Sequence, residues 1–118
     1  MKKEYRIKRE SDFRDIMNER QSFANRNLVV YIRQKEQPHF RVGLSVGKKV
    51  GNAVTRNHVK RLLRLSLKQL SSEIKPNIEF VLIARPAIKQ LSYEDVQKNV
   101  RHVLNLAGVI EEKENEGA

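Results

Sequence analysis

The histidines are the side chains of this 118-residue sequence best suited to acid–base chemistry, and there are three of them: His39, His58 and His102. A two-histidine nuclease needs both rings within hydrogen-bond reach of one substrate. These histidines fall in separate predicted elements, with no carboxylate pattern beside them. Solvated or partly buried histidines are therefore the favoured interpretation, and the sequence predicts no catalytic residue.

A second candidate for chemistry is the glycine- and lysine-rich stretch that begins at Gly43. A phosphate loop of the Walker type has four residues between its glycines and a Ser or Thr after its Lys. Here three residues separate Gly43 from Gly47, and a second lysine, Lys49, follows Lys48. A two-metal nuclease needs clustered carboxylates, which the basic half of the chain lacks. We therefore predict neither nucleotide hydrolysis nor a metal site made by the protein.

The distribution of charge is a stronger signal than any of these motifs. The sequence has 24 Lys and Arg against 14 Asp and Glu, a formal net charge of +10, yet no acidic residue lies between Glu36 and Glu73. The basic residues of that interval are Arg41, Lys48, Lys49, Arg56, Lys60, Arg61, Arg64 and Lys68. A surplus of this size on a small domain attracts phosphates. The sequence predicts a polyanionic partner, RNA or DNA.

A predicted helix over 55–70 positions most of these charges. Its apolar face consists of Val59, Leu62, Leu63, Leu67 and Leu70, with Leu65 as an outlier. The opposite sector, about 100° wide, holds Asn57, Lys60, Arg61, Arg64 and Lys68, with Arg56 at its margin. Unpaired like charges at this spacing destabilise an isolated helix. This face is therefore predicted to contact phosphates, with an affinity that falls steeply with salt.

The remaining elements follow from hydrophobic periodicity and from helix and turn signals. We predict a short helix from Ser11 to about Arg20, strands over 28–33 and 40–46, the basic helix over 55–70, a doubly buried strand over 78–84, and a helix capped by Ser92 that extends to about 107. The order α-β-β-α-β-α predicts one α+β domain over 1–110, with a mixed central sheet packed by helices. The first two strands are expected to pair antiparallel, and a β-α-β crossover follows, right-handed by the usual rule. Residues 111–118 are expected to form an acidic, disordered tail.

Several classes of protein are excluded by composition. The sequence contains no cysteine, which excludes a disulfide framework. No apolar run approaches the roughly 20 residues that span a bilayer, and the charged N-terminus does not look like a secretory signal. We expect a cytoplasmic protein without a membrane partner.

Residues 43–61, with the sequence GLSVGKKVGNAVTRNHVKR, resemble the signature of the bacterial ribonuclease P protein family. The likeness extends to Arg6-Ile7-Lys8, Asp12-Phe13, Ala24-Asn25-Arg26, Tyr31 and Ile83-Ala84-Arg85, and it covers roughly residues 5 to 107. The resemblance implies a subunit of the ribonucleoprotein endonuclease that removes the 5′ leader from precursor tRNA. It also implies that the RNA subunit catalyses the reaction with Mg²⁺ held mainly by RNA, that no protein partner is required, and that the β-α-β crossover is left-handed.

The resemblance also assigns two surfaces. The surface that docks on the catalytic RNA would comprise Lys48, Lys49, Asn52, Arg56, Asn57, His58, Lys60, Arg61, Arg64 and Lys68. A cleft for the single-stranded leader would include Phe13, Met17, Val29 and Tyr31. Two residues depart from the family pattern. His58 replaces the second arginine of an Arg-Asn-Arg motif, so that contact is weaker or depends on protonation. Met17 stands where an aromatic often lies, which would replace stacking by a soft apolar contact.

Strand alternation supports the cleft independently. Val29, Tyr31 and Arg33 share one face of their predicted strand, and Arg41, Gly43 and Ser45 share one face of the next. Small and basic side chains let a sugar-phosphate backbone approach, while Tyr31 offers a stacking plane. Arg33, Arg41 and Ser45 therefore complete the predicted leader cleft. Tyr31 and Phe13 are also compatible with ordinary core roles. A non-enzymatic RNA-binding protein, ribosomal or an assembly factor, with the same basic helix is the alternative function.

Overall fold

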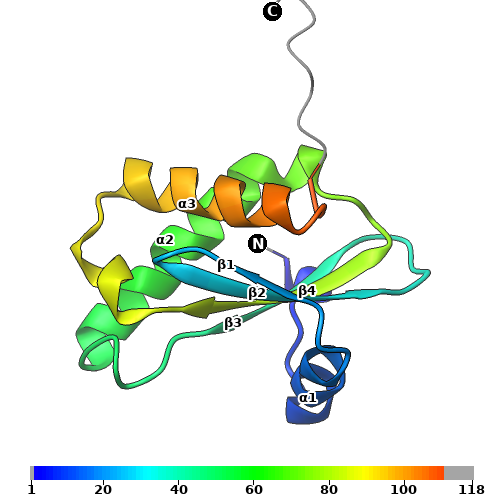
Figure 1. Ribbon diagram of the computed structural model, residues 1–118, viewed down its shortest axis with the longest axis horizontal. Coiled ribbons are helices and arrows are strands. Elements are labelled where there is room, and N and C mark those ends of the chain that lie inside the picture. Colours follow the sequence, from blue (N-terminus) through cyan, green and yellow to red (C-terminus); the bar gives the residue numbers. More distant parts are fainter. Residues whose placement is uncertain (1, 111–118) are drawn as a thin grey trace, which may run out of the picture.

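The computed structural model describes residues 2–110, and the predicted acidic tail lies outside the described residues. The helices are α1 (Glu10–Asn18), α2 (Ala53–Leu70) and α3 (Tyr93–Leu106), and short 3-10 helices cover Lys3–Tyr5, Ser71–Glu73 and Pro86–Gln90. The strands are β1 (Ser22–Ala24), β2 (Leu28–Gln34), β3 (Arg41–Ser45) and β4 (Ile78–Ala84). Figure 1 shows α2 and α3 on one face of the sheet and α1 on the other. The predicted α+β domain with a mixed sheet is confirmed.

The four strands form one sheet in the order β1-β2-β4-β3. β4 pairs antiparallel with β2 and parallel with β3, so β2 and β3 are not neighbours. The predicted antiparallel pairing of these two strands is therefore wrong. The physical reason lies in β4, which is buried on both faces except at Ile83. A strand of that kind is most stable in the middle of a sheet, where helices cover both sides.

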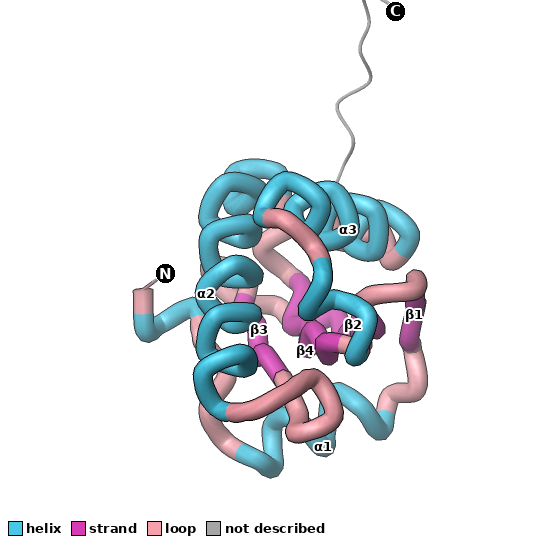
Figure 2. Tube along the Cα trace, turned by 90° about the vertical axis from the view of Figure 1, so that its left-hand side faces the viewer, coloured by secondary structure: helices cyan, strands magenta, loops and turns pink. Residues whose placement is uncertain are grey.

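The β-α-β unit is confirmed, because β3 and β4 are parallel neighbours connected through α2. In Figure 2, α2 runs alongside β3 and α3 lies above the sheet. The handedness of the crossover stays a prediction from the family resemblance.

The main hydrophobic core lies between the sheet and the α2–α3 layer. Val59, Leu63, Leu67 and Leu70 of α2 are buried there, as the predicted apolar face requires, while Leu65 is 44% exposed. The predicted stripe of α3, Val96, Val100, Val103, Leu104 and Ala107, is also buried. Under the opposite face a smaller cluster of Ile7, Ile16 and Val81 anchors α1. Burial on both faces fixes the sheet between the two helical layers.

All three helices begin within two residues of their predicted starts. Asn52 caps α2 by accepting a hydrogen bond from the Thr55 amide at 2.9 Å, and Ser92 caps α3 as predicted. The first helix begins at Glu10 without a side-chain cap and ends at Asn18, two residues before the predicted end. Arg20 follows with a φ of 58°, in the left-handed region, and reverses the chain towards β1.

No helix within residues 2–110 has both the length and the apolar character needed to cross a membrane.

Candidate nucleic-acid interface

The loop before α2 presents the first part of the predicted docking surface. The Val50 amide donates to the Gly47 carbonyl at 3.0 Å, and Gly51 donates to Lys48 at 3.2 Å. These turns bury Val50 in the core and leave the side chains of Lys48 and Lys49 exposed. Asn52 has its side-chain oxygen engaged by the Thr55 amide. Its role in the described structure is to cap α2, and an RNA contact of Asn52 stays a prediction.

The predicted basic face of α2 is present as a continuous surface. Asn57, His58, Arg61 and Lys68 are exposed, while Arg56, Lys60 and Arg64 are half-buried along its margins. None of these side chains makes an ion pair with a carboxylate within the described part of the chain. Arg56 also holds its Nε atom in a buried position without a hydrogen-bond partner. Unpaired guanidinium and ammonium groups are donors suited to phosphate oxygens.

A small hollow of about 120 Å³ opens beside this face, against the edge strand β3. Its polar lining consists of Arg6, Lys60 and Arg64, and its floor contains Val42 and Leu44. The N-terminal segment is held there because the Ile7 amide donates to the Val42 carbonyl at 2.9 Å. Arg6 therefore belongs with the predicted docking residues, although hydrophobic periodicity carries no signal for it. The only signal in the sequence for Arg6 was the likeness of Arg6-Ile7-Lys8 to the family pattern.

The opposite face of the sheet carries a larger hollow, of about 400 Å³, beneath α1. Three predicted cleft residues line it together: Phe13, Met17 and Ser45. Met17 is 36% exposed, which places an apolar side chain at its mouth. The rest of the lining was not predicted and consists of Glu10, Arg14, Leu44, Val81 and Ile83. Helical spacing places Arg14 and Met17 on neighbouring positions, so Arg14 could have been found once the face of α1 was known.

Close approach of Phe13 to the sheet depends on a glycine in β3. A Cβ atom placed on Gly43 would lie 2.5 Å from the Phe13 Cζ atom, closer than non-bonded atoms allow. Gly43 thus creates the flat site on which the Phe13 ring rests. The core interpretation of Phe13 is confirmed by this packing, and its role in a leader cleft stays a prediction.

The predicted cleft residues Val29 and Tyr31 do not line the hollow, but they lie on β2 beside residues of β4 that do. Val29 is in register with Ile83, and Tyr31 with Val81, both of which line the hollow. The Tyr31 ring packs against the small cluster that anchors α1 and is half-buried. Part of the ring is therefore buried in the core, and only its exposed part is accessible for the predicted stacking on a base.

Arg33 and Arg41 lie at the far end of the same face and share one acid. Glu79, on the central strand β4, is fully buried. Its carboxylate accepts from Arg33 Nη2 at 2.6 Å and from Arg41 Nη1 at 3.0 Å. The hydrogen bond to Glu79 raises the pKa of Arg33 above its ordinary value, against the opposing effect of burial. Lys35 and Asp12 lie at the periphery, at 4.0 Å from Glu79 and 3.9 Å from Arg41.

This arrangement fixes the two guanidinium groups rather than leaving them free for RNA. Their side chains are 20% and 28% exposed, so each presents only part of its charge at the surface. Glu79 was not predicted as a site residue, because the pattern of its strand does not show which side chains lie opposite it. Its register opposite both arginines was the missing information.

The described residues contain no group of three His, Asp or Glu side chains placed to hold a metal ion. His39 and His102 lie in different parts of the fold from His58. His39 contacts the Phe40 carbonyl through Nδ1 at 2.9 Å, and His102 contacts the Asn25 side chain at 3.2 Å.

Comparison with known proteins places this geometry in one family. Residues 1–108 match the Ribonuclease P family. The chain is 56% identical over 115 residues to the ribonuclease P protein component of Enterococcus faecalis, covering 97% of this chain and 98% of that protein. It is 52% identical over 107 residues to the Streptococcus thermophilus component, covering 91% and 96%.

Solved structures agree with the sequence matches. The Staphylococcus aureus RNase P protein has a TM-score of 0.84 and 42% identity, covering 91% of this chain and 98% of that one. A structure described as the S. aureus protein mutant with defective mRNA degradation activity has a TM-score of 0.86, also at 42% identity and with 92% of each chain covered. The Thermotoga maritima RNase P protein has a TM-score of 0.77 at 28% identity, covering 91% and 98%. The chain therefore belongs to the ribonuclease P protein family, the protein components of the endoribonuclease that matures the 5′ end of tRNA.

Proposed function

We propose that the chain holds two RNAs at once, the catalytic RNA on the basic face of α2 and the 5′ leader of precursor tRNA in the hollow beneath α1. The docking surface would comprise the predicted loop and helix residues together with Arg6. The leader would lie across Phe13, Met17 and Ser45, with Arg14 beside it. The protein supplies binding and positioning, and the RNA subunit carries out the cleavage.

The observation that carries this proposal is the position of Leu44 on the edge strand β3. Leu44 lines the hollow beside Lys60 and Arg64, and it also lines the hollow that holds Phe13 and Met17. The two surfaces therefore meet across the width of one strand. A leader bound on one side would lie next to the RNA docked on the other. Such an arrangement orients a substrate towards a catalyst, the contribution of proximity to rate.

The two surfaces differ in chemistry in the way that the two RNAs require. The α2 surface is cationic and lacks described ion pairs, which suits the backbone of a structured RNA. The hollow beneath α1 combines apolar side chains with one arginine and one glutamate. Single-stranded RNA exposes its bases and is bound through apolar and stacking contacts.

The cationic donors of the α2 surface fit phosphate oxygens and do not fit a metal cation. We therefore propose that Mg²⁺ is bound mainly by the RNA subunit, where it would activate water and stabilise charge in the cleavage step. A cytoplasmic location is part of the same proposal, because both RNA partners would be met there.

The proposal is tested by binding to two matched substrates. The complex of this protein with a bacterial ribonuclease P RNA should bind precursor tRNA with a leader more tightly than mature tRNA, and the RNA alone should discriminate less. If the protein improves binding of both substrates equally, the leader assignment fails. If it binds ribosomal RNA stably and ribonuclease P RNA poorly, the alternative of a ribosomal or assembly protein replaces it. The S. aureus structure named for an mRNA degradation activity makes an assay of the protein alone on mRNA a necessary control.

A further inference from the structure

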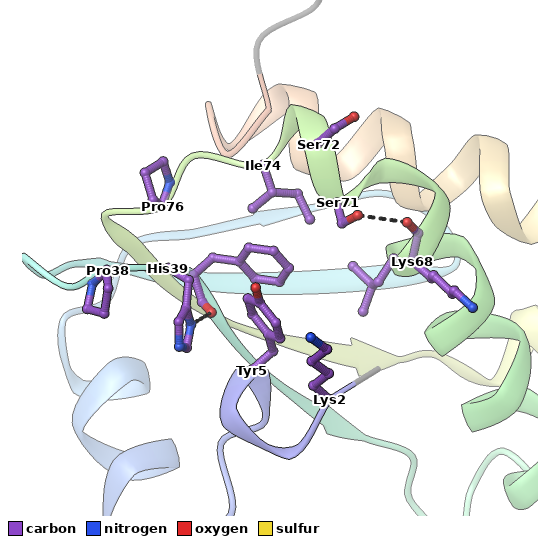
Figure 3. A pocket seen from close by; sticks show the side chains of 11 residues that line it. Lys2, Tyr5, Pro38, His39, Lys68, Ser71, Ser72, Ile74 and Pro76 are labelled. Atoms are coloured by element: carbon purple, nitrogen blue, oxygen red, sulfur yellow. Dashed lines mark hydrogen bonds between the residues drawn. The ribbon is translucent and has the colours of Figure 1, made fainter.

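A further hollow lies at the C-terminal end of α2, where the docking surface ends at Lys68. It has a volume of about 630 Å³, within the range of small-ligand sites. Figure 3 shows residues from three separate segments around it. The N-terminal 3-10 helix contributes Tyr5, the segment before β3 contributes His39, and the end of α2 contributes Lys68.

The wall of this hollow is aromatic. The ring centroids of Tyr5 and His39 are 4.3 Å apart and those of Tyr5 and Phe40 are 5.0 Å apart. Phe40 is buried, whereas Tyr5 and His39 are half-buried and keep part of their surface accessible. A continuous set of rings with an exposed part offers a plane on which a nucleobase can stack.

The polar part of the hollow is cationic. Its lining includes Lys2 and Lys68, both exposed, and contains no carboxylate. Glu73, which follows Ser71 and Ser72 in the chain, is paired with Arg101 at 2.9 Å. Ser71 and Ser72 also line the hollow, and the Ser71 hydroxyl donates to the Lys68 carbonyl at 2.9 Å (Figure 3). Lysine ammonium groups beside hydroxyls match a phosphate next to a ribose.

Lys68 also connects this hollow with the docking surface. Lys60, Arg64 and Lys68 recur every four residues on one face of α2, which places them over about 12 Å of helix. A strand whose phosphates follow this row would arrive at the aromatic wall. We infer that the hollow around Tyr5, His39 and Lys68 binds one nucleotide of single-stranded RNA, with the base on the rings and the phosphate on the lysines. This inference rests on the proposed RNA docking by α2.

Two substitutions separate stacking from packing. Tyr5→Phe keeps the ring, whereas Tyr5→Leu keeps apolar volume and removes it. Fluorescence anisotropy with a labelled single-stranded RNA of about ten nucleotides would measure the affinity of each. Tyr5→Leu should weaken binding about tenfold, and Tyr5→Phe should leave it nearly unchanged. Equal affinities for the two variants would overturn the inference.

A measurement on the unaltered protein guards against a variant that fails to fold. The ring resonances of Tyr5 and His39 should shift in NMR spectra when the RNA is added, and unmoved resonances would overturn the inference. Saturation by adenosine monophosphate at the same affinity as the RNA would also overturn it, in favour of a free-nucleotide site.

Binding to ribonuclease P RNA is measured in parallel. If Lys60→Ala weakens that binding while Tyr5→Leu changes nothing, only the nucleotide site fails. If the unaltered protein does not bind ribonuclease P RNA, the docking proposal itself fails.

Discussion

Arg33 on β2 donates to the fully buried carboxylate of Glu79 on β4 at 2.6 Å, and this contact joins β2 to the central strand on the face of the sheet that α1 covers. Arg41 on β3 binds the other oxygen of the same carboxylate at 3.0 Å. One acid thus bridges three adjacent strands from the middle of the sheet. Glu79 thus holds the side chains of Arg33 and Arg41 in fixed positions, at one end of the sheet face that also carries the hollow beneath α1.

Glu79→Gln should lower the free energy of unfolding by about 3 kcal/mol, because it leaves two arginines without their carboxylate. Glu73→Gln is the matched control, since Glu73 pairs with the more exposed Arg101, and it should cost below about 1 kcal/mol. Urea denaturation measures both. The pKa of Arg33 is raised in the folded protein. The stabilisation by Arg33 is therefore fully present at any pH below the ordinary arginine pKa and is lost only as the pH rises through the raised pKa. Equal losses of unfolding free energy for the two variants would contradict the conclusion that Glu79 is the acid that holds Arg33 and Arg41.

Gly43→Ala should displace the Phe13 ring, because the new Cβ would lie 2.5 Å from it. We expect a loss of about 1–3 kcal/mol in unfolding free energy and weaker binding of leader-bearing precursor. Gly47→Ala adds the same methyl group where no atom lies within 4 Å, so it should change neither property. Thermal melting and precursor affinity would be compared for the two variants, and an unaltered leader affinity in Gly43→Ala would remove Phe13 from the cleft.

Lys60→Ala should weaken assembly with the ribonuclease P RNA and flatten its dependence on salt. Each lost phosphate contact lowers the slope of log affinity against log salt by about 0.7–0.9. Lys98→Ala removes the same charge from an exposed site on α3 and should leave the slope unchanged. Filter binding over a range of salt concentrations gives both slopes. Identical slopes would show that the α2 face is solvated rather than bound.

Met17→Phe should tighten binding of leader-bearing precursor about fivefold, because Met17 is 36% exposed at the mouth of the hollow and an aromatic there could stack on a base. Mature tRNA lacks a leader and serves as the control substrate, with no expected gain. Competition binding with the reconstituted enzyme measures the change. A gain of equal size on both substrates would place Met17 outside the leader path.

The sequence predicted the helices and long strands well because their periodicity is strong. The apolar faces of α2 and α3 and the cap at Ser92 follow from local rules, whereas the cap at Asn52 was not predicted. β1 was missed because its three residues are all exposed, so no alternation marks it. The burial of β4 on both faces was predicted, but β2 and β3 were paired because they are adjacent in the sequence, and local patterns do not give the order of strands in a sheet.

The docking surface was predicted more completely than the cleft, because its residues are close together in the sequence. Most of the predicted docking residues lie on α2, and helical spacing alone gathers them on a face. The hollow beneath α1 joins that helix to two strands that are distant in sequence, so only Phe13, Met17 and Ser45 of the predicted cleft residues meet around it. Arg33 and Arg41 were predicted on the correct face, but their shared acid required the register of β4.

Reconstitution tests the central claim most directly. The protein is added to a bacterial ribonuclease P RNA, and cleavage of leader-bearing precursor tRNA is followed at near-physiological salt over a range of Mg²⁺ concentrations, with the protein alone as a control. We predict that the protein alone does not cleave the precursor, that it lowers the Mg²⁺ concentration the RNA requires, and that it raises substrate affinity. Unchanged cleavage and unchanged substrate affinity on addition of the protein would contradict the account.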